Sequence, residues 1–125
     1  MIAPASTFLF ADDPDAKLHL HIVLTAPLDG EAVVVSIETL YPGSKLERHV
    51  VLRPGDHPFI DHDSVPAYQF ANFFEIEKIE AAIVRGDAKL RENASDQLVI
   101  RLLRGLIDSD RTPNHIRQFC RNLAL

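Results

Sequence analysis

The stretch Leu18-His-Leu-His-Ile-Val-Leu-Thr25 decides the fold, because it begins with alternating apolar and polar residues and ends in an apolar run. Alternation with a period of two is typical of a β-strand that buries one face. The next segment, Pro27-Leu-Asp-Gly30, is a turn sequence, since proline presets one torsion and Asp-Gly favours a positive φ. Ala32-Val-Val-Val-Ser-Ile37 is rich in β-branched residues and predicts the second strand of a hairpin.

Three segments outside this hairpin predict further strands. Phe8-Leu-Phe10 is a short apolar segment that we expect at an edge of the sheet. Residues 46–52 form a strand-like run ended by Pro54-Gly55, and residues 67–73 alternate large side chains with small or polar ones. Short strands that follow one another with turns between them predict an antiparallel meander rolled into a small barrel.

Helical patterns replace the strand patterns near residue 75. Residues 75–84 carry isoleucines at the i, i+3 and i+7 spacing of one helical face, and Gly86 follows as a candidate C-cap. A second helix is expected to begin after the N-cap Ser95, with Gly105 weakening its last turn. A third, short helix is expected after Thr112, which we predict as its cap.

The length of the chain predicts a single domain over residues 1–125. We expect an α+β domain that is β-rich over 1–74 and helical over 75–125. The polar segment 87–94 is expected to be a mobile loop.

Charge and cysteine content narrow the partners and the compartment. Eighteen acidic side chains against thirteen basic ones give a net charge of −5, which argues against DNA binding and against broad nucleic-acid binding. Cys120 is the one cysteine, so no intrachain disulfide is expected, and we predict a small buried core residue there. No apolar run approaches the roughly 20 residues of a membrane span, and the N-terminus lacks the basic start of a signal peptide. We therefore expect a cytoplasmic protein that does not contact the membrane.

The candidate site is the stretch Arg53-Pro-Gly-Asp-His-Pro-Phe-Ile-Asp-His-Asp-Ser64, which places two His, three Asp, one Arg and one Ser within twelve residues. Two prolines and a glycine stiffen this loop, and rigid loops are where sites are commonly built. His57, with Asp56 before it and Arg53 on the same loop, forms a set suited to general acid–base chemistry at a phosphate. The alternative is that His57 hydrogen-bonds within the turn and fixes the course of the next segment.

Two other chemical interpretations of this loop are weaker. His57, Asp61, His62 and Asp63 are metal-ligand types, but their spacing matches no metal motif, so we expect no metal and no cofactor. Ser64 lacks the Gly-x-Ser-x-Gly context of a nucleophile. A polar turn in which the aspartates cap backbone N–H groups explains the same residues.

The chain resembles small bacterial proteins grouped with the MazF/PemK-like toxins. The resemblance lies in Ile22–Thr25, Val33–Thr39, Leu52–Phe59 and Leu103–Pro113, with Gly-Asp-His-Pro-Phe as its most specific element. It implies an SH3-like barrel that often dimerises, metal-independent cleavage of single-stranded RNA, and neutralisation by an antitoxin. The chain departs from the pattern in carrying Ala16-Lys17 where the toxins usually have Arg-Pro, and Thr39 and Glu38 align about equally well with a toxin threonine.

Two functions follow as alternative predictions. In a toxin-like ribonuclease, His57 is the acid–base group, Arg53 stabilises phosphate charge, and Asp61 or Asp63 orients the base. Asp56, His62, Ser64 and Thr39 are then the predicted binding residues. The alternative is a non-catalytic interaction module of the same fold that binds a protein partner through its sheet edge or the loop 57–64.

Overall fold

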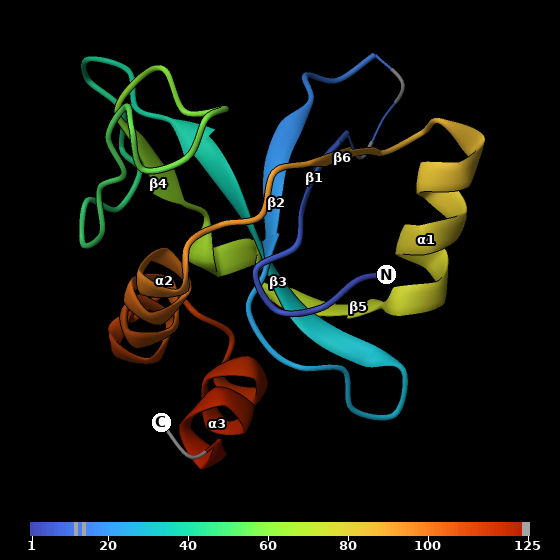
Figure 1. Cartoon of the computed structure of the whole chain (residues 1–125). Helices are drawn as coiled ribbons and strands as arrows, with labels where there is room; N and C mark the ends of the chain where they lie inside the picture. Colours follow the sequence, from blue (N-terminus) through green and yellow to red (C-terminus); the bar gives the residue numbers. More distant parts are fainter. Residues whose placement is uncertain (12, 14, 124–125) are drawn as a thin grey trace.

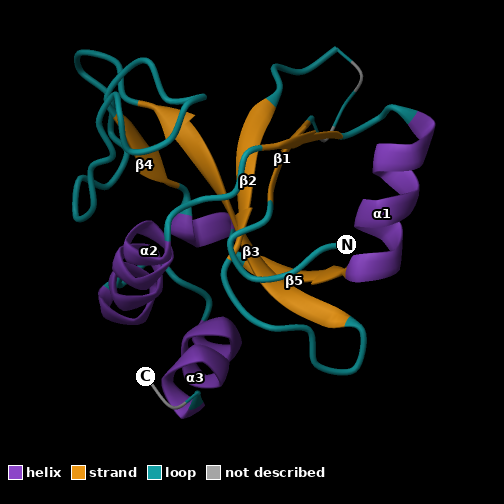
Figure 2. Cartoon of the chain, viewed as in Figure 1, coloured by secondary structure: helices purple, strands orange, loops and turns teal. Residues whose placement is uncertain are grey.

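The computed structural model describes residues 1–11, 13 and 15–123, which form an α+β structure (Figure 1, Figure 2). Its strands are β1 (Thr7–Phe10), β2 (His19–Val23), β3 (Glu31–Thr39), β4 (Ser64–Pro66), β5 (Asn72–Glu75) and β6 (Lys89–Arg91). Its helices are α1 (Ile76–Arg85), α2 (Asp96–Asp108), α3 (Asn114–Asn122) and the short 3₁₀ helix η1 (Tyr68–Phe70). None of these helices in the described part of the chain is long and apolar enough to cross a membrane.

Strand β3 organises the antiparallel sheet because it pairs along both edges. On one edge it pairs with β2, with Leu20 opposite Ile37. On the other edge its C-terminal half pairs with β4 and its N-terminal half pairs with β5, and η1 lies between these two short strands. The strand order is therefore β4-β3-β2-β1-β6, and β5 pairs with β3 on the same edge as β4.

The sheet of the described residues is open, so it does not confirm the closed barrel that the sequence predicted. Its outer strands are β6 at one end and β4 and β5 at the other, and these ends do not pair with each other. Helices lie on both sides of the sheet, with α2 and α3 on one side and α1 on the other (Figure 1). An open sheet covered on two faces can bury the continuous apolar run of β3, because alternate residues point to opposite sides.

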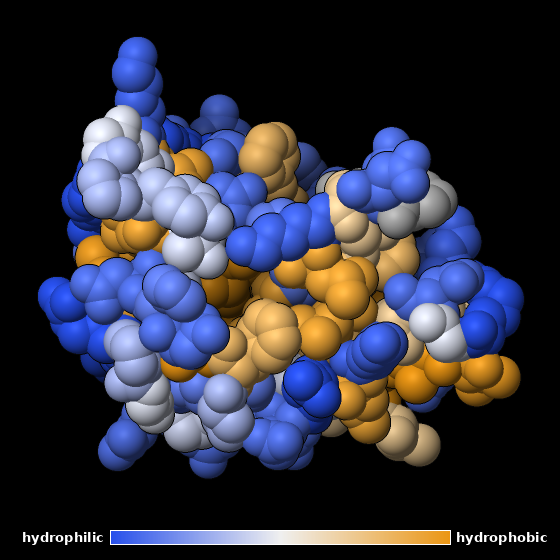
Figure 3. Space-filling view, turned by 90° about the horizontal axis from the view of Figure 1, so that it is seen from above, coloured by the Kyte–Doolittle hydropathy of each residue, from blue (hydrophilic) through white to orange (hydrophobic). Residues whose placement is uncertain are grey.

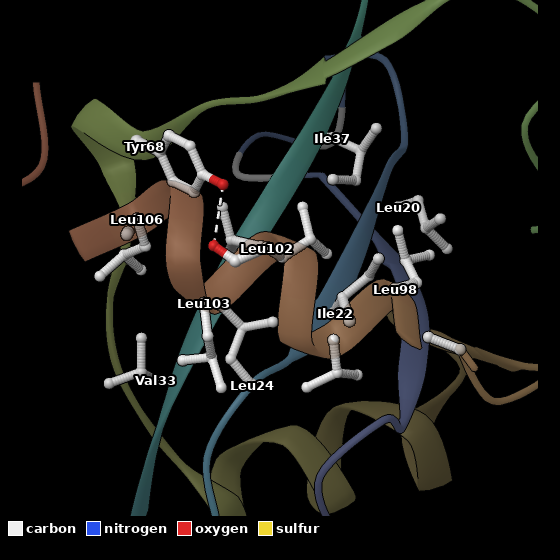
Figure 4. Packing of buried hydrophobic residues seen from close by; sticks show 14 of the residues in the cluster. Leu20, Ile22, Leu24, Val33, Ile37, Tyr68, Leu98, Leu102, Leu103 and Leu106 are labelled. Atoms are coloured by element: carbon white, nitrogen blue, oxygen red, sulfur yellow. Dashed lines mark hydrogen bonds between the residues drawn. The ribbon is translucent and has the colours of Figure 1, made fainter. Parts of the chain in front are cut away.

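The larger core lies between the sheet and the helices α2 and α3. Leu102, Leu106 and Ile116 are fully buried there, and each buried leucine or isoleucine stabilises the fold by about 1.5–3 kcal/mol. Figure 4 shows α2 lying across the strands, with its leucines directed at Leu20, Ile22, Leu24, Val33 and Ile37. Cys120 belongs to this core, which confirms its prediction as a buried residue.

Gly105 permits the close approach of α2 to η1. The hydroxyl of Tyr68 donates a hydrogen bond to the carbonyl of Leu102 at 2.8 Å (Figure 4). A Cβ added to Gly105 would overlap that hydroxyl and come within 2.5 Å of Val50 Cγ2. Gly105, which was predicted to weaken the last turn of the helix, is therefore needed for this packing, and α2 continues past it to Asp108.

The smaller core lies on the other face, beneath α1. It contains Phe8, Val23, Val34 and Ile79, so β3 contributes neighbouring valines to opposite faces of the sheet. The end of α1 at Gly86 confirms the predicted C-cap, because this glycine adopts the left-handed conformation with φ 86°.

Of the two N-terminal helix caps predicted from the sequence, one is confirmed and one is wrong. The cap of α2 is confirmed, since Ser95 Oγ accepts a hydrogen bond from the Leu98 N–H at 3.1 Å. The cap predicted at Thr112 is wrong, because its hydroxyl donates to the Leu106 carbonyl and Pro113 precedes the first residue of α3.

Several predicted strands differ from those observed. Residues 46–51 form no strand, and Leu52 makes only an isolated bridge with Ser64, because β4 and β5 occupy the free edge of β3. The predicted strand 67–73 is instead η1 followed by β5. Phe8–Phe10 lies in β1, an inner strand between β2 and β6. The predicted loop 87–94 contains β6, which is the second strand that pairs with β1.

Candidate functional site

His57, the predicted acid–base residue, is buried, with 2% of its surface exposed. Its Nδ1 accepts a hydrogen bond from the Phe59 N–H at 3.0 Å, so the ring proton lies on Nε2. Nε2 donates to the carbonyl of Glu92 at 2.6 Å, and the Thr7 hydroxyl donates to the same carbonyl at 2.7 Å. Both ring nitrogens are engaged with the fold, and this geometry favours a structural role for His57 over a catalytic one.

These bonds tie the polar loop to distant parts of the chain. Glu92 follows β6, and Thr7 begins β1, so His57 joins the loop to the far edge of the sheet. The Arg91 guanidinium lies 5.6 Å from the centre of the Phe59 ring and adds a cation–π contact to the same junction. The loop after His57 is therefore held in one position.

Arg53 makes two hydrogen bonds within the polar loop, one through its backbone and one through its side chain. The Arg53 N–H donates to Asp56 Oδ2 at 2.8 Å, which closes the Pro-Gly turn. The Arg53 guanidinium donates to Asp63 Oδ2 at 2.9 Å, with 67% and 49% of these two side chains exposed. Exposed pairs contribute about 0–1 kcal/mol, so this ion pair orients side chains more than it stabilises the fold.

A cleft of about 270 Å³ opens between the polar loop and the ends of β2 and β3. We call it the polar-loop cleft, and it contains four of the predicted site residues: Thr39, Asp61, His62 and Ser64. Its other lining residues are Lys17, Leu18, His19, Leu20, Ile37, Tyr41, Phe59 and Ile60. The view from above shows an apolar hollow bordered by hydrophilic side chains on this face (Figure 3). The other four predicted residues, Arg53, Asp56, His57 and Asp63, do not line the cleft.

The cleft contains a histidine–carboxylate pair. His62 Nδ1 lies 2.6 Å from Asp61 Oδ1, and this hydrogen bond lowers the pKa of the Asp61 carboxyl below its usual value. A carboxylate at Nδ1 leaves Nε2 as the nitrogen that can exchange a proton with a ligand. Ser64 is not activated by this pair, because its hydroxyl donates to the backbone carbonyl of His62 at 2.8 Å.

Three polar residues of the cleft were not among the residues predicted from the sequence. The Lys17 ammonium donates to the Tyr41 hydroxyl at 3.4 Å, and the His19 ring lies against the Ile37 carbonyl. Tyr41 has 59% of its surface exposed. Lys17 and His19 carry no sequence signal that associates them with residues 61–64, because only the pairing of β2, β3 and β4 brings them together.

The described residues do not include a group of three or more His, Cys, Asp or Glu side chains arranged to hold a metal ion. Comparison with protein-family models, with curated proteins and with solved structures finds no match to this chain. The resemblance to MazF/PemK-like toxins therefore stays a prediction from the sequence.

Proposed function

We propose that the protein is a non-catalytic interaction module that binds a protein partner at the polar-loop cleft. The observation that carries this proposal is the burial of His57 with both ring nitrogens hydrogen-bonded to the fold. A general base must reach the proton that it removes, and a buried, doubly bonded imidazole does not. The same bonds make the loop a rigid platform, which lowers the entropy cost of binding.

The composition of the cleft supports recognition of a protein surface. Tyr41 and Phe59 are exposed aromatic side chains, and aromatic residues are enriched where proteins bind one another. Asp61 and His62 add exposed polar groups beside them, hydrogen-bonded to each other at 2.6 Å. The net charge of −5 favours a protein partner over a nucleic acid.

A second candidate is a metal-independent ribonuclease that uses His62 in place of His57. The Asp61–His62 pair favours it, because a carboxylate-oriented imidazole is a suitable general base, and Lys17 supplies a cation in the same cleft. The SH3-like barrel, the homodimer and the antitoxin that accompany such an activity are supported by the sequence resemblance alone.

Photo-crosslinking tests the first proposal. A photoreactive phenylalanine analogue replaces Tyr41 in the cleft, and the control carries it at the exposed Gln118 on α3. After irradiation in the source cells, a discrete crosslinked protein from the Tyr41 position alone supports the module. Absence of any adduct specific to Tyr41, from folded protein, contradicts it.

RNA cleavage distinguishes the second candidate. Purified protein is incubated with a long unstructured RNA in EDTA, beside the His62→Ala variant. Cleavage by the wild type that His62→Ala abolishes would establish the ribonuclease and overturn the non-catalytic assignment. No cleavage by folded wild-type protein supports the module.

A further inference from the structure

A second polar pocket lies on the sheet face that also carries α1. It has a volume of about 170 Å³, and no residue of α1 lines it. Its walls include three phenylalanines and one carboxylate: Phe10, Phe70, Phe74 and Glu38. We call it the Glu38 pocket.

Among the described residues that line this pocket, the carboxylate of Glu38 is the only fixed charge. Glu38 is half-buried, and its backbone pairs with Val65 in the sheet. Within the described part of the chain, its carboxylate makes no ion pair and accepts no hydrogen bond. A single carboxylate in the wall of a hollow lined otherwise by uncharged groups gives that hollow a negative potential, so the pocket is electrostatically suited to a cation.

The histidine and phenylalanine side chains that line the pocket are also compatible with a bound cation. His19 Nδ1 lies 3.3 Å from the Ile37 carbonyl, which can only accept, so Nδ1 carries the proton and Nε2 is an acceptor in the neutral ring. The rings of Phe10 and Phe74 pack against the His21 ring, with centroids at 5.9 and 6.0 Å. Ammonium and guanidinium groups carry donors only, and the faces of aromatic rings attract them.

The size of the pocket points to a side chain of a protein and not to a free ligand. Pockets for small molecules measure about 300–1,000 Å³, so 170 Å³ holds one side-chain terminus. Phe10 and Phe74 also line a neighbouring apolar groove of about 450 Å³ under α1. A peptide segment could place a basic residue in the pocket and an apolar residue in this groove.

We propose that the Glu38 pocket binds a lysine or arginine side chain of a protein partner. The pocket is a separate site from the polar-loop cleft, since His19 is the one residue of the described chain that lines both. The variants that test the two sites therefore differ, and failure of one proposal leaves the other standing.

Amide NMR titration tests the pocket directly. The probes are N-acetyl-lysine N-methylamide and its arginine counterpart, and N-acetyl-norleucine N-methylamide is the uncharged control. We expect saturable shifts of the Ser36, Glu38 and Phe74 amides with at least one of the two cationic probes. The Glu38→Gln variant is expected to bind that probe about tenfold more weakly, because a charge-assisted contact is lost.

The matched control is Glu31→Gln, which removes an exposed carboxylate at the other end of β3 and is expected to leave binding unchanged. Three results would overturn the proposal: no saturable shift with either cationic probe, equal binding of the norleucine control, or equal affinity of folded Glu38→Gln. Tighter binding of choline than of both amino-acid probes would overturn the assignment to a protein side chain.

Discussion

The His57→Ala variant is expected to lose about 3 kcal/mol of unfolding free energy. Part of this loss comes from the cavity left by a side chain that is 2% exposed. Another part comes from the Phe59 N–H, which loses its acceptor at a cost of about 1–3 kcal/mol. The Glu92 carbonyl contributes little, because it keeps the hydrogen bond from Thr7. A loss of this size is a large share of the free energy of unfolding of a typical protein, which is about 5–15 kcal/mol.

Urea unfolding followed by circular dichroism measures this loss by linear extrapolation. The His57→Asn variant is expected to recover about 1 kcal/mol, since its side-chain oxygen can accept from the N–H two residues on, as in an Asx turn. The matched control is His62→Ala, whose side chain is 68% exposed and whose loss should lie within about 0.5 kcal/mol. Equal stability of His57→Ala and His62→Ala would refute the structural role.

Three further predictions concern other parts of the molecule. Gly105→Ala is expected to destabilise the fold by about 1–2 kcal/mol in urea unfolding, although alanine has the better helix propensity. Adding Tyr68→Phe to the same chain should recover part of this loss, because it removes the hydroxyl that the new Cβ would overlap. A Gly105→Ala variant more stable than the wild type would contradict the packing argument. Burial raises the pKa of the Cys120 thiol to about 11. A disulfide reagent at about pH 8 should therefore label this thiol only as fast as the protein unfolds. Rapid labelling of the folded protein would contradict the burial of Cys120. The Asp61 carboxyl should titrate below its usual pKa by NMR and shift upward in His62→Ala, and an unchanged midpoint would remove the evidence for the pair.

The candidate site was predictable only in part. The sequence placed Asp61, His62 and Ser64 on one stiff loop, and the structure places them in one cleft. It also identified both possible roles of His57 but could not choose between them. The choice depends on Glu92, which lies 35 residues away in the chain and has no local signal.

The sequence by itself determined the features that depend on neighbouring residues. The strands around residues 18–25 and 32–37, the isoleucine face of α1, and the caps at Gly86 and Ser95 follow from periodicity and from local backbone preferences. These features hold because each is decided within a few residues of the chain.

Only the tertiary structure decided the features that depend on long-range pairing. Strand β6 forms from a polar segment because β1 offers a free edge, and residues 46–51 remain outside the sheet because β4 and β5 already occupy the edge of β3. The same packing buries His57 and leaves Glu38 without a partner among the described residues. Burial and pairing across the fold are set by which surfaces meet, and a residue's local sequence does not contain that information.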